Sequence, residues 1–225
     1  MSNKRGFNQI VADTEEYFGR WSYHGRRANK KTRYAIPEDD FMIYATGSEI
    51  HFTADINDET IEAMIKVLTN VIKEQTNRHL GEDEKADIVY IVDSPGGHIT
   101  SVLKFVDFIK MSKKKYPQLR FTSVITGRAA SAGTIMSVVA DRRKMTENAF
   151  AMIHELNGGG YRMSYTEQKS SWLFSDKLHH RLNKIYLDHI DNEDLDEEKL
   201  EVLLRNTSWF SAEEYKELGF VQEII

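Results

Sequence analysis

The chain has 225 residues, a formal net charge of −5 at pH 7, 40% hydrophobic and 29% charged side chains, and no cysteine. This length suits one domain with a short appendage. The lack of cysteine excludes disulfides, thiolate metal sites and cysteine nucleophiles, and the negative charge argues against general nucleic-acid binding. No apolar run is long enough to predict a membrane span and no targeting segment is recognisable, so we expect a cytoplasmic protein.

The first 40 residues differ in pattern from the rest. They are polar, lack a sustained periodicity and carry six basic side chains over residues 20–33 without an intervening acid. We predict a polar, partly basic N-terminal arm over residues 1–40 and favour a solvated charged face over a docking or pore-lining segment. Residues 41–225 are expected to form a single domain.

Strand-like and helix-like patterns alternate from residue 41 onward. Short β-like runs around Gly47 precede a helix that we expect to be capped by Asp58, since apolar residues then recur at intervals of three and four. The continuous apolar run over residues 88–92 predicts a strand buried on both faces. A second amphipathic helix follows, with an apolar side formed by Val102, Phe105, Val106 and Ile109.

The alternation continues through the middle of the chain. A strand over residues 121–125 is expected to lead into a glycine turn at residues 127–133 and a third helix that ends near Ala140. A further strand ends at His154, and a glycine turn at residues 158–160 comes after it.

The last part of the chain is predicted to be mainly helical. A long helix is expected over residues 165–189, followed by an acidic linker over residues 188–198, two shorter helices and a final β-like segment at residues 220–221. Strands that alternate with helices indicate βαβ units and a layered α/β fold.

Two glycine-containing turns lie between a strand and a helix, which is where ligands bind in α/β folds. One ends at Gly97 and the other lies at Ser131. Each offers amide donors at a positive helix end, and two such donors that converge on one point make an oxyanion hole. An ordinary tight turn is the alternative for the first of them. Neither turn has a phosphate- or dinucleotide-binding pattern, and we predict no cofactor.

Two side chains near these turns are candidates for catalysis. Ser131 has small neighbours, so a substrate backbone can approach its hydroxyl, and His154 stands at a strand end that suits a general base. Taken alone, such a serine is more often a helix cap or a packing residue, and such a histidine is more often structural. Together with the two turns they supply the components of acyl transfer. The other histidines form no metal-binding pattern, and no metal site is predicted.

Four short segments follow one another in a recognisable order. They are residues 93–97 (DSPGG), 127–133 (GRAASAG), 152–154 (MIH) and 211–215 (SAEEY), the last one preceding 219–222 (GFVQ). In composition, order and approximate spacing they resemble the motifs of the ClpP family, the proteolytic subunits of the Clp protease. The resemblance extends over about residues 49–223.

The resemblance implies a ClpP/crotonase-like spiral of ββα units with a protruding handle helix, here residues 165–189. It implies that Ser131 is the nucleophile and His154 the general base. The oxyanion donors would be the amides of Gly97 and Ala132. It further implies polypeptide substrates, self-assembly into two stacked heptameric rings around a chamber, and a Clp-type ATPase unfoldase as partner.

The third catalytic position departs from the family pattern. The family's aspartate, four positions before the serine of the SAEEY segment, is replaced by Thr207, which is adjacent to Asn206. In serine proteases the change of this aspartate lowers kcat by about 10⁴-fold, because it orients the histidine and stabilises the imidazolium. Asn206 is an alternative orienting residue if the loop shifts by one position, and residues 191–198 are an alternative source of an acid. Asp93 replaces the family's usual asparagine, and its carboxylate would raise the pKa of the histidine if it pointed inward.

The leading hypothesis is therefore a ClpP-like serine endopeptidase of low activity. The first alternative is a catalytically impaired or inactive ClpP-like subunit with an assembly role, which the neutral Thr207 suggests. The second is an acyl-CoA enzyme of the crotonase type, which shares the ββα spiral and the two-amide oxyanion hole. Such an enzyme needs no serine–histidine pair, so Ser131 and His154 argue against it.

Overall fold

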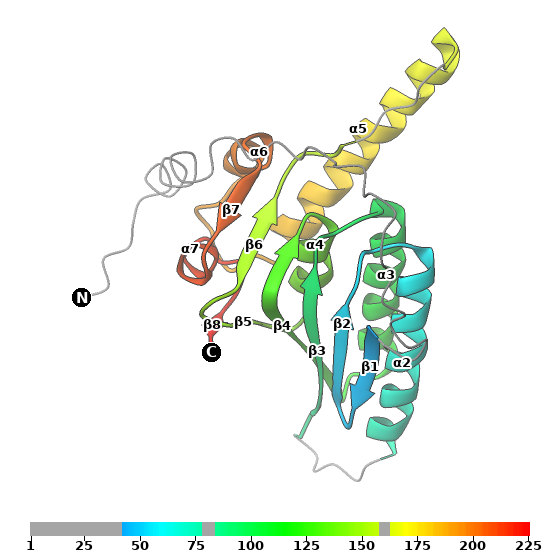
Figure 1. Cartoon of the computed structure of the whole chain (residues 1–225), viewed down its shortest axis with the longest axis vertical. Coiled ribbons are helices and arrows are strands. Elements are labelled where there is room, and N and C mark those ends of the chain that lie inside the picture. Colours follow the sequence, from blue (N-terminus) through cyan, green and yellow to red (C-terminus); the bar gives the residue numbers. More distant parts are fainter. Residues whose placement is uncertain (1–41, 78–83, 158–162) are drawn as a thin grey trace, which may run out of the picture.

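A computed structural model describes residues 42–77, 84–157 and 163–225. The N-terminal arm predicted over residues 1–40 and the glycine turn predicted at residues 158–160 lie outside the described residues. The described residues form a sheet with helices packed around it (Figure 1). The α/β class predicted from the sequence is confirmed.

The strands are β1 (Ile43–Thr46), β2 (Glu49–Thr53), β3 (Ala86–Ser94), β4 (Leu119–Ala130), β5 (Arg142–Met145), β6 (Phe150–Ile153), β7 (Ser208–Phe210) and β8 (Glu223–Ile224). In the described part of the chain they make one eight-stranded sheet whose main path is β1-β2-β3-β4-β5-β8. All neighbours along this path are parallel except β1 and β2. β6 pairs in parallel with the end of β4, and β7 is antiparallel to β6.

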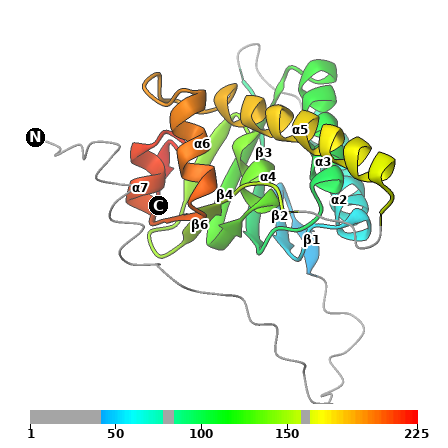
Figure 2. The same ribbon diagram turned by 90° about the horizontal axis from the view of Figure 1, so that it is seen from above.

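The helices are α2 (Asp58–Thr76), α3 (Ile99–Lys115), α4 (Ala132–Val138), α5 (Tyr165–Leu187), α6 (Glu197–Arg205) and α7 (Ala212–Glu217). α2 and α3 lie side by side against one face of the sheet, whereas α6 and α7 lie near β7 (Figures 1 and 2). α5 projects away from the body, and its buried residues all lie between Leu182 and Tyr186, near its C-terminal end. This is the protruding helix that the sequence predicts. None of the helices in the described ranges has the length and hydrophobicity needed to cross a membrane.

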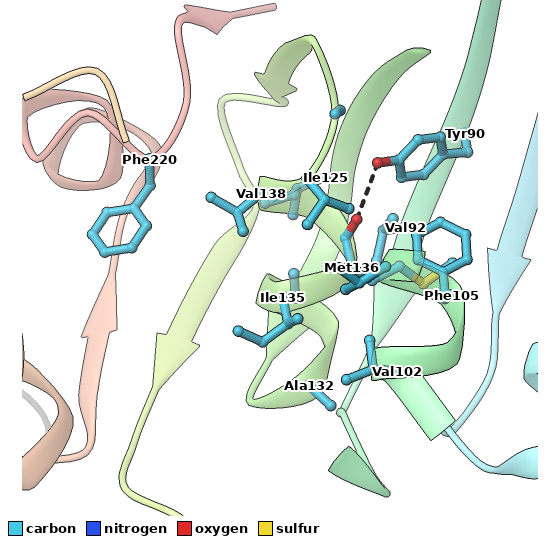
Figure 3. Packing of buried hydrophobic residues seen from close by; sticks show 14 of the residues in the cluster. Tyr90, Val92, Val102, Phe105, Ile125, Ala132, Ile135, Met136, Val138 and Phe220 are labelled. Carbon is cyan, nitrogen blue, oxygen red and sulfur yellow. Dashed lines mark hydrogen bonds between the residues drawn. The ribbon is translucent and has the colours of Figure 1, made fainter. Parts of the chain in front are cut away.

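One face of the central strand β3 is fully buried and the other is partly exposed, so the predicted burial on both faces is correct for one face only. Its side chains alternate between fully buried and half-buried, and Ile88, Tyr90 and Val92 have no exposed surface. Tyr90 packs edge-on against Phe105 of α3, so the strand and the helix share one hydrophobic core (Figure 3). Burial of apolar surface of this kind is the main favourable contribution to folding.

Two buried side chains of the sheet anchor α4, the helix that follows Ser131. The hydroxyl of Tyr90 donates to the carbonyl of Met136 at 3.0 Å, and Ser123 Oγ donates to the carbonyl of Ser137 at 2.9 Å (Figure 3 shows the first). Both carbonyls lie in the last turn of the helix, where no intrahelical donor is available. Burial raises the pKa of Tyr90, so this hydroxyl remains a donor at neutral pH.

The structure differs from the sequence prediction most clearly at β4. The strand was expected to end at Ile125, but it continues to Ala130 because its last residues pair with both β3 and β6. Gly127 permits this continuation with a φ of 59°, and a Cβ there would lie 3.1 Å from the carboxylate of Asp93. A turn was predicted over residues 127–133, but only Ser131 separates the end of β4 from the start of α4.

Smaller differences occur at element ends. The cap of α2 is Asn57, whose side chain accepts from the amide of Thr60, so Asp58 is the first helical residue rather than the cap. β5 and β7 were not predicted, because four and three residues are too few to show a periodic pattern. The last strand is β8 at residues 223–224 rather than 220–221, because Glu223 and Ile224 are the residues that pair with β5.

The anchoring of α4 predicts a stability effect at Tyr90. The change Tyr90→Phe removes the donor and leaves the buried carbonyl of Met136 without a partner, so we expect the free energy of unfolding to fall by about 1–3 kcal/mol. Urea denaturation followed by circular dichroism at fixed protein concentration measures this difference. Tyr44→Phe, at a side chain with 44% exposure, is the matched control and should change stability little. Equal effects of the two substitutions would show that the buried hydrogen bond does not matter.

Candidate active site

Ser131 occupies a strained turn between β4 and α4. It is the N-cap of α4, with a φ of 53° and a ψ of −121°, a conformation that residues with a side chain rarely adopt. Its backbone is held on both sides: the amide donates to the carbonyl of Met152 at 2.7 Å, and the carbonyl accepts from the hydroxyl of Thr134 at 2.6 Å. The turn therefore places the serine hydroxyl at the carboxyl end of β4 in a fixed direction.

His154 is brought to the serine by the pairing of β4 with β6. Ala130 pairs with Met152 in parallel register, so the residues that follow each strand meet at the same edge of the sheet. The distance from Nε2 of His154 to Oγ of Ser131 is 2.8 Å. The structure thus unites the two side chains that the sequence identified as a candidate nucleophile and a candidate general base.

The second ring nitrogen of His154 contacts a residue that was not predicted. Nδ2 of Asn157 lies 3.1 Å from Nδ1 of the imidazole. Burial lowers the pKa of His154 from its ordinary value, and a hydrogen bond with the backbone of Glu155 partly opposes this effect. The only signal for Asn157 in the sequence is an amide side chain three residues after the histidine, which is common in loops and carries little information.

The Gly96-Gly97 turn lies directly against the serine turn. A Cβ on Gly96 would come within 2.5 Å of the carbonyl oxygen of Ala130 and 2.8 Å of Cβ of Ser131, so no other residue fits there without a shift. The same position is 3.2 Å from the amide nitrogen of Ala132. The two amide-rich turns therefore converge, as the sequence analysis required for an oxyanion hole.

The amides of Gly97 and Ala132 are both available at this junction. The amide of Ile56 donates to the carbonyl of Gly96, and the amide of His98 donates to the carbonyl of Ile56. Gly97 lies between these two hydrogen bonds, so its own amide points away from Ile56. Ala132 opens α4, where first-turn amides lack an intrahelical acceptor. Neither amide has a hydrogen-bond partner in the described part of the chain.

These groups line a cleft of about 280 Å³. Pro95, Gly97, Ser131 and His154 lie on its wall, and the other walls come from α4, α5, α6 and the loop after β6. Most of the remaining lining is apolar and consists of Ile99, Ile135, Met152, Leu156, Leu182 and Leu204. The cleft therefore offers a largely apolar surface next to the serine hydroxyl.

In the described part of the chain, neither Thr207 nor Asn206 has a hydrogen bond to the ring of His154. Thr207 is exposed, has a φ of 50°, and its amide donates to the carbonyl of Leu204 at 3.3 Å. Asn206 is the C-cap of α6. Among the described residues, the side-chain hydrogen bonds of the imidazole go to Ser131 and Asn157 instead. The 206–207 loop is nevertheless nearby, since the amide of Glu155 donates to Leu204 at 3.0 Å.

Asp191 and Asp196, two of the carboxylates considered as replacements for the third residue, have other partners. Asp191 pairs with the buried Arg143, and Asp196 caps α6 by accepting from the amide of Lys199. Asp93 accepts from the amide of Arg128 at 3.3 Å. It therefore does not point inward, and the pKa of the histidine is lowered rather than raised. No cluster of three or more histidine, aspartate or glutamate side chains suited to a metal ion occurs within residues 42–77, 84–157 and 163–225.

The arrangement has the geometry of nucleophilic acyl transfer. A hydroxyl lies at hydrogen-bond distance from an imidazole, and two amides without a partner among the described residues flank the same serine. An open, mainly apolar cleft gives a substrate access to them.

Comparison with known proteins supports a family assignment. The family model for Clp protease matches residues 79–225, which is more than half of the chain. The ATP-dependent Clp protease proteolytic subunit of Leuconostoc citreum is 31% identical over 152 residues, which are 64% of this chain and 70% of that protein. The proteins of the same name from Streptococcus thermophilus and Streptococcus salivarius are 32% and 31% identical over 146 residues, 64% of this chain and 71% of theirs. The chain therefore belongs to the Clp protease family.

Proposed function

We propose that this protein is a serine endopeptidase subunit of the Clp type, with Ser131 as nucleophile and His154 as general base. The observation that carries the proposal is the 2.8 Å contact between Oγ and Nε2 at the wall of an open cleft. The names of the relatives, which describe proteolytic subunits, support polypeptides as substrates.

The proposed reaction proceeds through an acyl-enzyme. Nε2 of His154 takes the proton of the serine hydroxyl while Oγ forms a bond to the scissile carbonyl carbon, and the carbonyl oxygen gains negative charge. The amides of Gly97 and Ala132 donate to this oxyanion. The imidazolium then gives its proton to the leaving amine as the C–N bond breaks. Water hydrolyses the ester in the same two steps, with His154 again as base and then as acid.

The electrostatics of the site favour a slow enzyme. A half-buried, neutral imidazole is ready to accept a proton at pH 7, because partial burial lowers the pKa of His154. The imidazolium that forms in the reaction has no carboxylate hydrogen-bonded to it among the described residues. In serine proteases that carboxylate contributes about 10⁴-fold to kcat, so a fraction of this loss is expected here.

A non-catalytic subunit with an assembly role is the second candidate. It is favoured by the neutral Thr207 at the family's acidic position and by the exposed location of that side chain. Assembly is supported by α5, which carries the exposed apolar side chains of Tyr165, Trp172, Leu173 and Phe174 outside the core. We propose that this helix stacks two heptameric rings in either case. A Clp-type ATPase as partner and a cytoplasmic location complete the proposal.

Covalent labelling distinguishes the two candidates. A fluorophosphonate probe should label the wild-type protein at Ser131, and Ser131→Ala should abolish the labelling, because the probe reacts only with an activated serine. Ser170→Ala, at an exposed position of α5, should label like the wild type. Folded wild-type protein that is never labelled, alone or with Clp-type ATPases, would favour the assembly role.

The pH dependence of labelling reports the state of the histidine. Only the neutral imidazole accepts the serine proton, so the labelling rate should rise with pH through the pKa of His154. Since burial lowers this pKa, the midpoint should fall below about 6.5, the ordinary value of histidine. Rates measured between about pH 4.5 and 8 give the midpoint directly. A midpoint above the ordinary value would contradict the environment described for the ring.

The role of α5 in assembly is open to a separate test. The double change Trp172→Glu and Phe174→Glu should separate the stacked rings, because it places charges on the exposed apolar surface. Sedimentation velocity should then show a particle of about half the wild-type mass. Lys177→Glu, an exposed residue of the same helix, is the control for added negative charge. Unchanged sedimentation of the double variant would locate the ring contact elsewhere.

A further inference from the structure

We infer that Asn157 is the positioning residue for the imidazole of His154, in the place that the family gives to an aspartate. This inference rests on the proposed function of Ser131 and His154. It adds a third member to the site from the loop after β6, rather than from the 206–207 loop that the family pattern indicates.

The ring of His154 is held from both of its nitrogen atoms. Nε2 lies 2.8 Å from Oγ of Ser131, and Nδ1 lies 3.1 Å from Nδ2 of Asn157. Both distances are within the range of ordinary hydrogen bonds. Two contacts at opposite sides of a planar ring determine its orientation, which is the first task of a third catalytic residue.

The second task is to stabilise one tautomer of the imidazole. An amide side chain can stabilise either tautomer, because it has both a donor and an acceptor. When Nδ2 of Asn157 donates to Nδ1, the ring proton is on Nε2 and points at the oxygen of Ser131. This tautomer cannot accept the serine proton. Rotation of the amide by half a turn presents Oδ1 to the ring instead, so Nδ1 carries the proton and Nε2 is free to accept. A carboxylate offers only acceptors and would stabilise the second tautomer alone.

No other side chain in the described residues competes for this position. Glu155, on the same loop, faces Arg205 of α6 at 3.9 Å. On α5, His179 and Tyr186 line the cleft, and His179 contacts Asn183 at 3.2 Å and Glu201 at 3.6 Å. These are the titratable and charged groups that line the cleft or face the loop. None of these side chains has a hydrogen bond to the imidazole, whose side-chain partners in the described residues are Ser131 and Asn157, beside a hydrogen bond with the backbone of Glu155.

The inference predicts opposite effects for two substitutions of Asn157. Asn157→Asp keeps the shape, fixes the acceptor orientation and adds a negative charge, so the pKa of His154 should rise by about one unit. The rate of fluorophosphonate labelling at about pH 8 should increase about tenfold. Asn157→Leu removes the contact and should lower the rate about tenfold with little change in the pKa.

Two measurements on the full-length protein test these effects. One is the labelling rate as a function of pH, and the other is the NMR titration of protein labelled with ¹⁵N-histidine, which reports the tautomer and the pKa of the ring without any need for activity. Asn70→Asp makes the same change at an exposed position of α2 and is the control for added charge. A role of Asn157 in folding alone would alter thermal stability without raising the pKa of His154 in the aspartate variant.

The outcomes separate this inference from the proposed function. Absence of any labelling of the wild type would contradict the proposed function, but a higher pKa of His154 in Asn157→Asp would still support the contact with the ring. Labelling of the wild type with unchanged rates and pKa in both Asn157 variants would overturn the inference alone. A larger increase in the pKa for Thr207→Asp than for Asn157→Asp would also overturn it, because the family position would then orient the ring.

Discussion

The parallel pairing of β4 with β6 is the interaction on which the candidate site depends. It joins Ser131 to His154 across 23 residues of sequence, because the amide of the serine donates to the carbonyl of Met152 in the neighbouring strand. That hydrogen bond also helps to keep Ser131 at its positive φ. Without such contacts the backbone would relax to a conformation of lower energy. The same backbone contact thus sets the backbone strain at Ser131 and the position of His154.

The hydrophobic core holds α4, and with it Ser131, in position. α4 has seven residues, too few to be stable by its own hydrogen bonds. Its last carbonyls are bonded by Tyr90 and Ser123, and its first turn lies against the Gly96-Gly97 turn at distances that exclude a Cβ. Packing inside proteins is close to crystalline, so displacement at one end of such a helix is transmitted to the other. The serine is therefore positioned by the hydrophobic core as well as by its own turn.

The sequence predicted the parts of the fold and the site that local patterns determine. The amphipathic spacing in α2 and α3, the apolar run of β3 and the glycines at residues 96–97 all point to structures that form there. β5 and β7 could not be predicted, because strands of three or four residues are too short to show an alternating pattern. They form through pairing with β4 and β6, which are distant in the sequence or not visible as partners there. Asn157 was missed for a related reason: its contact with the imidazole depends on how the loop after β6 turns, and no periodicity encodes that path. Thr207 was identified as the departure from the family pattern, but its exposed location required coordinates.

The proposed role of Asn157, an amide in place of the family's aspartate, has a consequence for the whole site. An aspartate stabilises the imidazolium by its charge, whereas an amide supplies a hydrogen bond without a charge. The lowered pKa of His154 is consistent with a neutral surrounding, because a nearby carboxylate would raise it. Such a ring accepts a proton less favourably, and it stays unprotonated to a lower pH than an ordinary histidine. With Asn157 in the proposed positioning role, His154 would be available as a base at lower pH but would react more slowly, and the orientation of its ring would depend on the rotation of one side chain rather than on a fixed ion pair.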